Sequence, residues 1–170
     1  NNPSTVPDAD GEWFELTNTS AVAIDLIGAE LLDEDGDLAV VTDHLWIDPG
    51  AYVVLGSNLD ELTNGGVWLD WGYAVADLAL GNGADELEVL HDGWLLDEVR
   101  YDDGATFPDP SGASMQLDAA VLDNTANDAG VNWCASHTWL EIQPGGDAGT
   151  PGAANAPCCP DLEGDEYADA

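Results

Sequence analysis

Acidic side chains gathered in three loops are the residues of this sequence whose types and spacing could hold a ligand. They are Asp8 and Asp10, then Asp33, Asp35 and Asp37, and finally Asp123 and Asp128. Ca²⁺ takes about six to eight oxygen ligands, so we expect Ca²⁺ as the cofactor of these loops. The run over residues 33–37 does not match an EF-hand, because its glycine and the distal glutamate stand at the wrong offsets. A solvated turn is the alternative interpretation of each loop.

Three cysteines, Cys134, Cys158 and Cys159, could form one disulfide and leave one thiol over. Adjacent cysteines pair poorly with each other, so we expect a bridge from Cys134 to either Cys158 or Cys159. The remaining thiol either stays free or links two chains. A disulfide indicates an oxidising compartment, and we therefore expect a secreted protein that acts outside the cell or on its surface.

The charge balance excludes several classes of partner. The chain has 35 acidic residues and a single basic one, Arg100, which gives a net charge of −34. Nucleic acids and anionic membrane surfaces need several Lys or Arg, so neither is expected to bind. Direct membrane insertion is not expected either, since no run approaches the roughly 20 apolar residues of a span. Such a charge opposes compaction, and the folded state should therefore need high salt, divalent cations or both.

No arrangement of residues predicts catalysis. The three histidines, His44, His91 and His137, have no evident serine or cysteine partner, and no phosphate-binding or metalloprotease motif occurs. Carboxylates are too numerous for one pair to indicate a glycosidase. We expect no catalytic residues. The seven tryptophans are expected mainly in the core and at edges, and a sugar-stacking platform is the alternative.

The distribution of turn residues predicts an all-β sandwich. Nineteen glycines and nine prolines separate short apolar runs, and helical periodicity is nearly absent. Strands are expected over residues 12–18, 21–26, 29–32, 39–42, 51–55, 86–90, 94–101 and 114–117. The clearest local pattern is a hairpin whose tight turn is Asp92-Gly93, because this pair tolerates positive φ. Within the hairpin, Leu87, Val89, Leu95 and Val99 are expected to face the core, and Glu86, Glu88, Asp97 and Glu98 to face water or a cation.

An ordered series of short motifs resembles the bacterial lamin tail domain. The matching segments are 10–16 (DGEWFEL), 18–20, 25–26, 47–50, 52–56, 97–101, 112–117, 132–134 and 149–152, followed by Asn155 and the closing cysteine. The resemblance covers about residues 1–158. It defines one domain over 1–158, in which the Gly/Pro-rich segment 145–157 is a strap over the sandwich, and an acidic tail over 159–170.

The resemblance implies an immunoglobulin-like β-sandwich of about 8–9 strands, usually a non-catalytic module of secreted or surface proteins. Lamin tail sequences usually begin with an apolar strand just before an Asn-Pro dipeptide, whereas this sequence starts at Asn1-Asn2-Pro3. A sandwich that lacks an edge strand exposes unpaired backbone groups and an apolar groove. Either a strand from a neighbouring molecule fills this groove, or residues upstream of Asn1 do so.

Together these features predict a structural or adhesive subunit rather than an enzyme. We expect an extracellular assembly of copies of this chain, such as a filament, held by strand addition, by cations between acidic faces and by an interchain disulfide. The alternative is an accessory module of a larger secreted enzyme that binds a surface or a polysaccharide, for which exposure of Trp68 and Trp71 on one face would be evidence. A calcium-dependent enzyme has the least support.

Overall fold

The computed structural model describes residues 2–33, 36–138 and 146–158, and its regular elements are almost all strands. The strands of this part are β1 (Trp13–Thr17), β2 (Ile24–Asp25), β3 (Glu30–Leu32), β4 (Leu38–Val40), β5 (Trp46–Ile47), β6 (Tyr52–Gly56), β7 (Trp71–Gly72), β8 (Ala84–His91), β9 (Trp94–Asp102), β10 (Met115–Leu117) and β11 (Trp133–Ala135). The helical elements are one turn, α1 (Asp8–Gly11), and three short 3-10 helices, η1 (Ala119–Val121), η2 (Ala126–Asp128) and η3 (Gly130–Asn132). The expected all-β class is confirmed. Among the described residues, no helix is long and apolar enough to cross a membrane.

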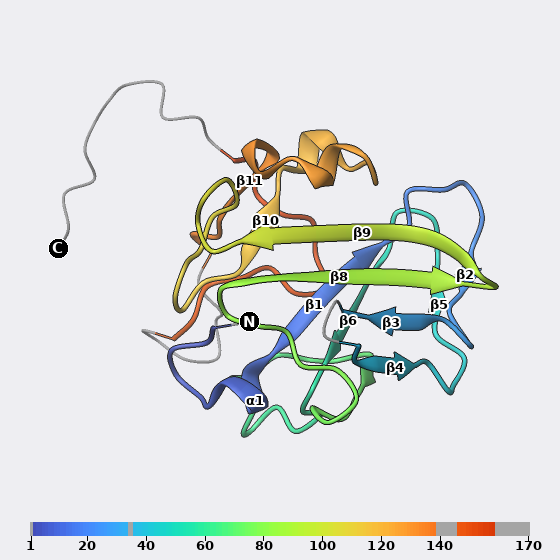
Figure 1. The fold of residues 1–170 in the computed structure, drawn as a ribbon, viewed down its shortest axis with the longest axis horizontal. Coiled ribbons are helices and arrows are strands. Elements are labelled where there is room, and N and C mark those ends of the chain that lie inside the picture. Colours follow the sequence, from blue (N-terminus) through green and yellow to red (C-terminus); the bar gives the residue numbers. More distant parts are fainter. Residues whose placement is uncertain (1, 34–35, 139–145, 159–170) are drawn as a thin grey trace, which may run out of the picture.

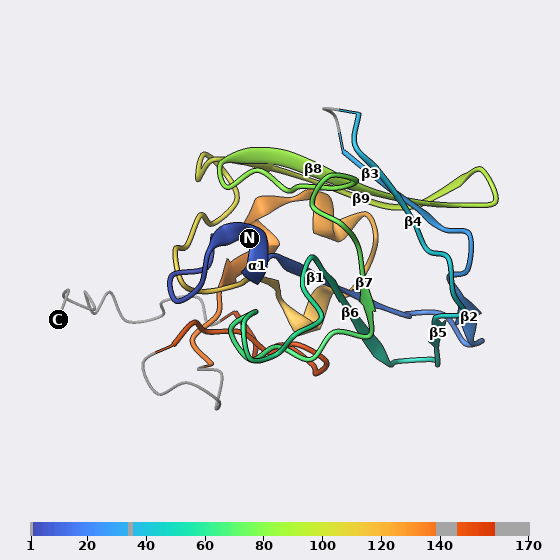
Figure 2. The same cartoon turned by 90° about the horizontal axis from the view of Figure 1, so that it is seen from below.

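The strands form two main layers. One is an antiparallel sheet in the order β4-β3-β8-β9, and the other has the order β1-β6-β7 (Figure 1). Seen from the side, the four-stranded sheet lies above the layer of β1, β6 and β7 (Figure 2). Two further pairs, β2 with β5 and β10 with β11, complete the strand pairing of the described part. The arrangement is a β-sandwich in which β1 is an edge strand.

The core lies between the two layers. Leu31 of β3 and Leu55 of β6 are fully buried there, and Phe14 and Leu16 of β1 pack against the same cluster. The opposite face of β1 carries Trp13, which packs against a second, smaller cluster. Strand side chains alternate between the two faces of a sheet, so β1 separates an inner face from an outer one.

The tight turn predicted between the two longest strands is confirmed. Asp92 and Gly93 connect β8 to β9 with φ angles of 52° and 78°. Two successive positive φ angles are typical of the type I′ hairpin turn, whose twist matches that of the flanking strands.

One expected orientation within this hairpin is wrong. The register shifts between Val89 and Leu90, so Leu90 pairs with Leu95 instead of following the simple alternation. A bulge of this kind moves later side chains to the other face, and Leu95 is therefore 54% exposed. Glu86 faces a cation, as expected: its side chain is buried, and Arg100 lies 3.6 Å from its carboxylate.

Candidate functional site

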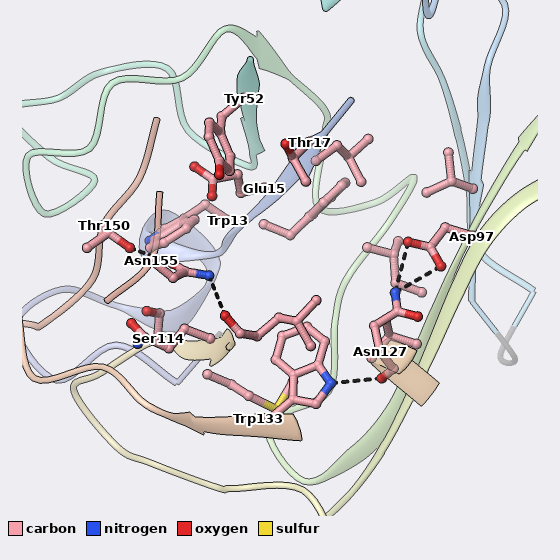
Figure 3. A pocket seen from close by; sticks show the side chains of 18 of the residues that line it. Trp13, Glu15, Thr17, Tyr52, Asp97, Ser114, Asn127, Trp133, Thr150 and Asn155 are labelled. Atoms are coloured by element: carbon pink, nitrogen blue, oxygen red, sulfur yellow. Dashed lines mark hydrogen bonds between the residues drawn. The ribbon is translucent and has the colours of Figure 1, made fainter. Parts of the chain in front are cut away.

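A partly open cleft of about 510 Å³ penetrates the sandwich beside the edge strand β1 (Figure 3). Protein interiors are normally packed without voids much larger than a water molecule, so a space of this size is a candidate binding site. The residues that line it include Trp13, Glu15 and Thr17 of β1, Met115 and Leu117 of β10, Asp97 and Val99 of β9, and Trp133 of β11. The cleft therefore lies between β1 and β10 and reaches the four-stranded sheet.

The outer edge of β1 presents unpaired backbone groups to this cleft. Backbone hydrogen bonds from Asn18 to Ala51 and from Ser57 to Glu12 show which residues of β1 direct their N–H and C=O groups toward β6. Bonded residues alternate along an antiparallel strand, so the N–H and C=O groups of residues 13, 15 and 17 point away from β6. No other strand of the described part pairs with this edge.

The outer edge of β10 is also largely free. Residues 114, 116 and 118 bond toward β11, as the contacts of Ser136 with Ser114 and of Asp118 with Asn132 indicate. The backbone groups of Met115 and Leu117 therefore point away from β11. The carbonyl of Leu117 accepts a hydrogen bond of 3.0 Å from the Asn155 side chain.

A strap over residues 146–158 crosses the outside of the cleft. Near its start, Asp147 accepts hydrogen bonds from Ser4 and from the Thr5 hydroxyl, which ties the strap to the N-terminal segment. Further along, the Gly152 N–H donates to Glu15 on β1, and Asn155 reaches Leu117 on β10. The strap thus links the two free edges without filling the space between them (Figure 3).

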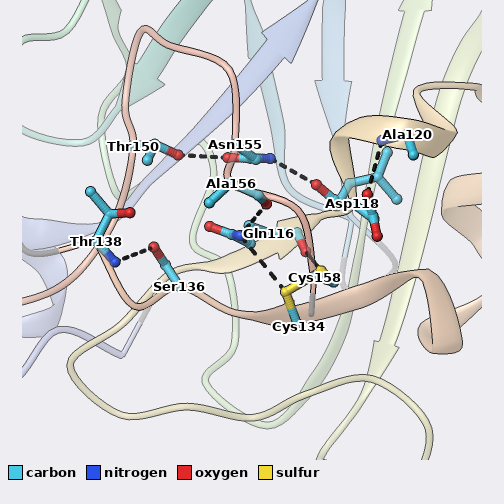
Figure 4. Close-up of a disulfide and its surroundings, with 11 residues drawn as sticks. Gln116, Asp118, Ala120, Cys134, Ser136, Thr138, Thr150, Asn155, Ala156 and Cys158 are labelled. Carbon is cyan, nitrogen blue, oxygen red and sulfur yellow. Dashed lines mark hydrogen bonds between the residues drawn. A yellow bond between two sulfur atoms is a disulfide. The ribbon is translucent and has the colours of Figure 1, made fainter. Parts of the chain in front are cut away.

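A disulfide between Cys134 and Cys158 closes the end of the strap (Figure 4). The S–S distance is 2.12 Å, and 24 positions separate the two residues in sequence. Of the two bridges left open by the sequence, the structure has the one to Cys158; Cys159 lies outside the described residues. Gln116 of β10 lies against this corner, where its amide donates a hydrogen bond of 2.9 Å to the carbonyl of Ala156.

Glu15 is the acidic group of β1 at the cleft. Burial raises the pKa of its carboxyl to about 7, although the backbone N–H groups of Gly152 and Ala153 stabilise the charged form. Asp70 adds to the increase by repulsion. Near neutral pH the cleft therefore holds a carboxylate that is only partly ionised and has no basic side chain among its partners.

A second carboxylate, Asp97 of β9, lies on the far wall of the cleft. Burial raises its pKa, and two hydrogen bonds of 2.9 Å from the Asn127 amide partly offset this effect. The indole N–H of Trp133 donates to the backbone carbonyl of Asn127 at 2.8 Å (Figure 3). These contacts hold η2 against β9 and β11 and fix the shape of that wall.

Two buried side-chain oxygens at the cleft have no hydrogen-bond donor within the described part of the chain. They are Oε1 of Gln116 and Oδ1 of Asn127, which belong to residues 4% and 5% exposed. Both residues line the cleft. Buried polar atoms are normally paired, so an acceptor without a donor at a cavity is evidence for a bound group that carries donors.

The structure does not bring the predicted acidic positions together. No group of three or more acidic, histidine or cysteine side chains suited to a metal occurs among the described residues. Asp8 and Asp10 lie on α1, and Asp33 accepts a hydrogen bond from the Asp37 N–H within a turn. Asp123 accepts hydrogen bonds from the backbone of residues 125 and 126, and Asp128 lies in η2. Asp35 lies outside the described residues, and Ca²⁺ stays a prediction.

Neither Glu15 nor Gln116 of the cleft was singled out from the sequence. Glu15 is the one charged residue of the strand WFELT, and Gln116 stands between Met115 and Leu117. A lone polar residue in the middle of an apolar strand was therefore an available signal. Its meaning depends on which strand edge is unpaired, and this requires the pairing pattern.

Comparison with protein-family models, with curated proteins and with solved structures finds no match for this chain. The geometry of the cleft is therefore the main guide to function.

Proposed function

We propose that this protein is a non-catalytic structural or adhesive subunit of an extracellular assembly that accepts an extended peptide strand into the cleft between β1 and β10. We also propose that its sandwich is immunoglobulin-like and of the lamin tail type. The quoted motifs support the family, and the disulfide suits an extracellular location.

The observation that carries the proposal is that two unpaired strand edges border one cleft. Residues 13, 15 and 17 offer backbone donors and acceptors on one side, and Met115 and Leu117 offer them on the other. An added strand gains main-chain hydrogen bonds along such an edge and specificity from alternate side-chain pockets. Glu15 and Asp97 are both held by neighbouring amide groups, which favours binding over catalysis.

Copies of the chain are the neighbours that we propose within this assembly. At a net charge of −34, two copies repel each other unless cations lie between their acidic faces. Ca²⁺ or high salt would supply these cations, and Cys159 could add a disulfide between chains. Light scattering tests this part: the mass in solution should increase with Ca²⁺, and an unchanged monomer mass would exclude it.

The test of strand addition uses a synthetic peptide and two substitutions of Thr17. The peptide Ser-Val-Thr-Val-Gln-Val-Thr-Val-Ser, with blocked ends, should bind with a saturable isotherm. Thr17→Pro removes an outward N–H and should abolish binding, whereas Thr17→Val keeps that N–H and should bind as the unchanged chain does. Both variants lose the hydroxyl contact with Ala51, so a difference in peptide binding between them measures the effect of the backbone N–H at the strand edge.

Absence of binding, or equal binding by Thr17→Pro, would overturn the proposal. If Thr17→Pro does not fold, hydrogen exchange at the β1 amides of the unchanged chain, with and without peptide, gives the same test. Peptide-dependent protection at residues 13, 15 and 17 supports strand addition, and its absence contradicts it.

A second candidate is an accessory module that binds a surface or a polysaccharide. Trp46, Trp68 and Trp94 are 60%, 67% and 76% exposed, and exposed tryptophans suit stacking on sugar rings. Trp71 packs against the core, so it does not form a platform with Trp68. Retention on insoluble polysaccharide that is lost in Trp68→Ala or Trp94→Ala would favour this candidate.

A further inference from the structure

The faces of β1 determine what an incoming strand must present. Phe14 and Leu16 face the core, whereas Trp13, Glu15 and Thr17 alternate with them on the other face. A strand that pairs with the outer edge of β1 continues the same two faces. Its side chains therefore point alternately into the sandwich and toward the strap.

Positions that point into the sandwich require apolar side chains. Leu87, Val89, Val99 and Leu122 line this part of the cleft. Burying an aliphatic side chain against such a wall stabilises a complex, whereas an unpaired polar group there would be destabilising.

The position beside Glu15 has a different requirement. Glu15 pairs with Val54, whose N–H donates to Asp70 at 2.8 Å, and repulsion from the Asp70 carboxylate acts on Glu15. The donors to Glu15 are backbone N–H groups of the strap. Among the described partners of Glu15, none is a basic side chain.

The chain offers no Lys or Arg that could supply a permanent positive charge at this position. It has no Lys, and its single Arg100 lies on β9 between Glu86, Glu88 and Glu98, with contacts of 2.8 to 3.6 Å. A cation beside Glu15 would therefore have to come from a molecule of different composition.

We infer that the strand that fills the cleft comes from a partner molecule and carries Lys or Arg at the position beside Glu15, with apolar residues on either side of it. This inference rests on the proposed strand addition and narrows it, since it assigns the donor to a more basic partner and not to a second copy. Charge complementarity then adds specificity to the main-chain hydrogen bonds.

The test compares three peptides of the form Ser-Val-Thr-Val-Xaa-Val-Thr-Val-Ser in which Xaa is Lys, Gln or Glu. The Lys peptide should bind about tenfold more tightly than the Glu peptide, with the Gln peptide between them. A scrambled Lys peptide of the same composition measures the general attraction of a basic peptide to this acidic chain. The Lys peptide should bind more tightly than its scrambled version, because general attraction alone would not distinguish the two.

Substitutions of Glu15 assign the preference to one residue. Glu15→Gln should bind all three peptides with similar affinity, and Glu15→Lys should prefer the Glu peptide. Glu61→Gln is the matched control, because Glu61 is exposed and does not line the cleft. This variant should keep the preference of the unchanged chain.

Each outcome separates the two proposals. Equal binding of the three peptides, or a preference that survives in Glu15→Gln, overturns the inference about the partner and leaves strand addition standing. Self-association that is blocked by the Gln peptide would identify a second copy as the donor and would also overturn the inference. If none of the peptides binds, strand addition itself is wrong.

Discussion

The carboxylate of Glu15 accepts a hydrogen bond of 2.5 Å from the backbone N–H of Gly152, which lies 137 positions further along the sequence. This contact holds the strap against the edge strand β1 at the border of the cleft. Glu15 therefore has two roles in the proposed function: it anchors the strap, and it lies where an incoming strand would pass.

Replacing Glu15 should change how stability depends on pH. The folded chain raises the pKa of Glu15 from 4.5 to about 7, so it binds this proton more tightly than the unfolded chain does. The resulting stability is fully present below about pH 4.5 and is lost as the pH increases through 7. Because solvent screens this partly exposed group, we expect an effect of about 1 kcal/mol, which corresponds to about 2–4 °C in Tm.

Thermal unfolding of Glu15→Gln between pH 4 and pH 8 measures this effect. The variant should melt about 2–4 °C above the unchanged chain at pH 8, and the difference should disappear at low pH. Glu61→Gln controls for the loss of one negative charge. Parallel curves for Glu15→Gln and the unchanged chain would show that Glu15 does not titrate as described.

Removing the disulfide should destabilise the domain and release the strap. A bridge across 24 positions stabilises the fold by about 3 kcal/mol in the loop-entropy model. Denaturant unfolding of Cys134→Ser should show a loss of this size, whereas Cys159→Ser should unfold as the unchanged chain does. An equal loss of stability in Cys159→Ser would show that Cys159, and not Cys158, is the partner of Cys134.

Arg100 should stabilise the hairpin by separating three carboxylates. Glu86 and Glu88 on β8 and Glu98 on β9 all contact its guanidinium group. Because Arg100 is half exposed, we expect Arg100→Gln to cost about 1–2 kcal/mol at low salt. The cost should decrease in concentrated NaCl, and Arg100→Lys should be intermediate. A stability for Arg100→Gln equal to that of the unchanged chain at low salt would contradict this role.

Stability should also depend strongly on dissolved cations. Repulsion among 35 acidic residues decreases as ionic strength increases, so Tm should increase with NaCl. The predicted calcium sites add a more specific expectation: CaCl₂ should raise Tm above NaCl of equal ionic strength, and Asp33→Asn with Asp37→Asn should reduce this excess. Equal Tm values in the two salts would show that Ca²⁺ stabilises the chain only by general screening and does not bind at these sites.

The strands found from sequence were those with a clear period of two or a marked turn. The ranges expected around β1, β6, β8 and β9 overlap the observed strands, and the turn at Asp92-Gly93 has the expected backbone angles. The expected ranges also overlap the short strands β2, β3, β4 and β10, whereas the equally short β5, β7 and β11 were not expected. Tertiary pairing determines them.

The cleft could be predicted less well, because it depends on relations between distant segments. The lamin tail resemblance led us to expect an open edge, and β1 has one, but the sequence did not indicate that β10 borders the same space. The orientation of Leu95 was wrong for a similar reason, since a register shift in the hairpin leaves no mark in the sequence pattern. The importance of Glu15 follows from strand pairing alone.

Hydrogen exchange at single β1 amides tests the central claim most directly. In the isolated chain, the amides of Phe14 and Leu16 should exchange slowly because they bond to β6, whereas those of Trp13, Glu15 and Thr17 should exchange quickly. Adding the Lys peptide should slow exchange at these three positions and leave the other two unchanged. Slow exchange at Glu15 in the isolated monomer, or no change on adding the peptide, would contradict the account.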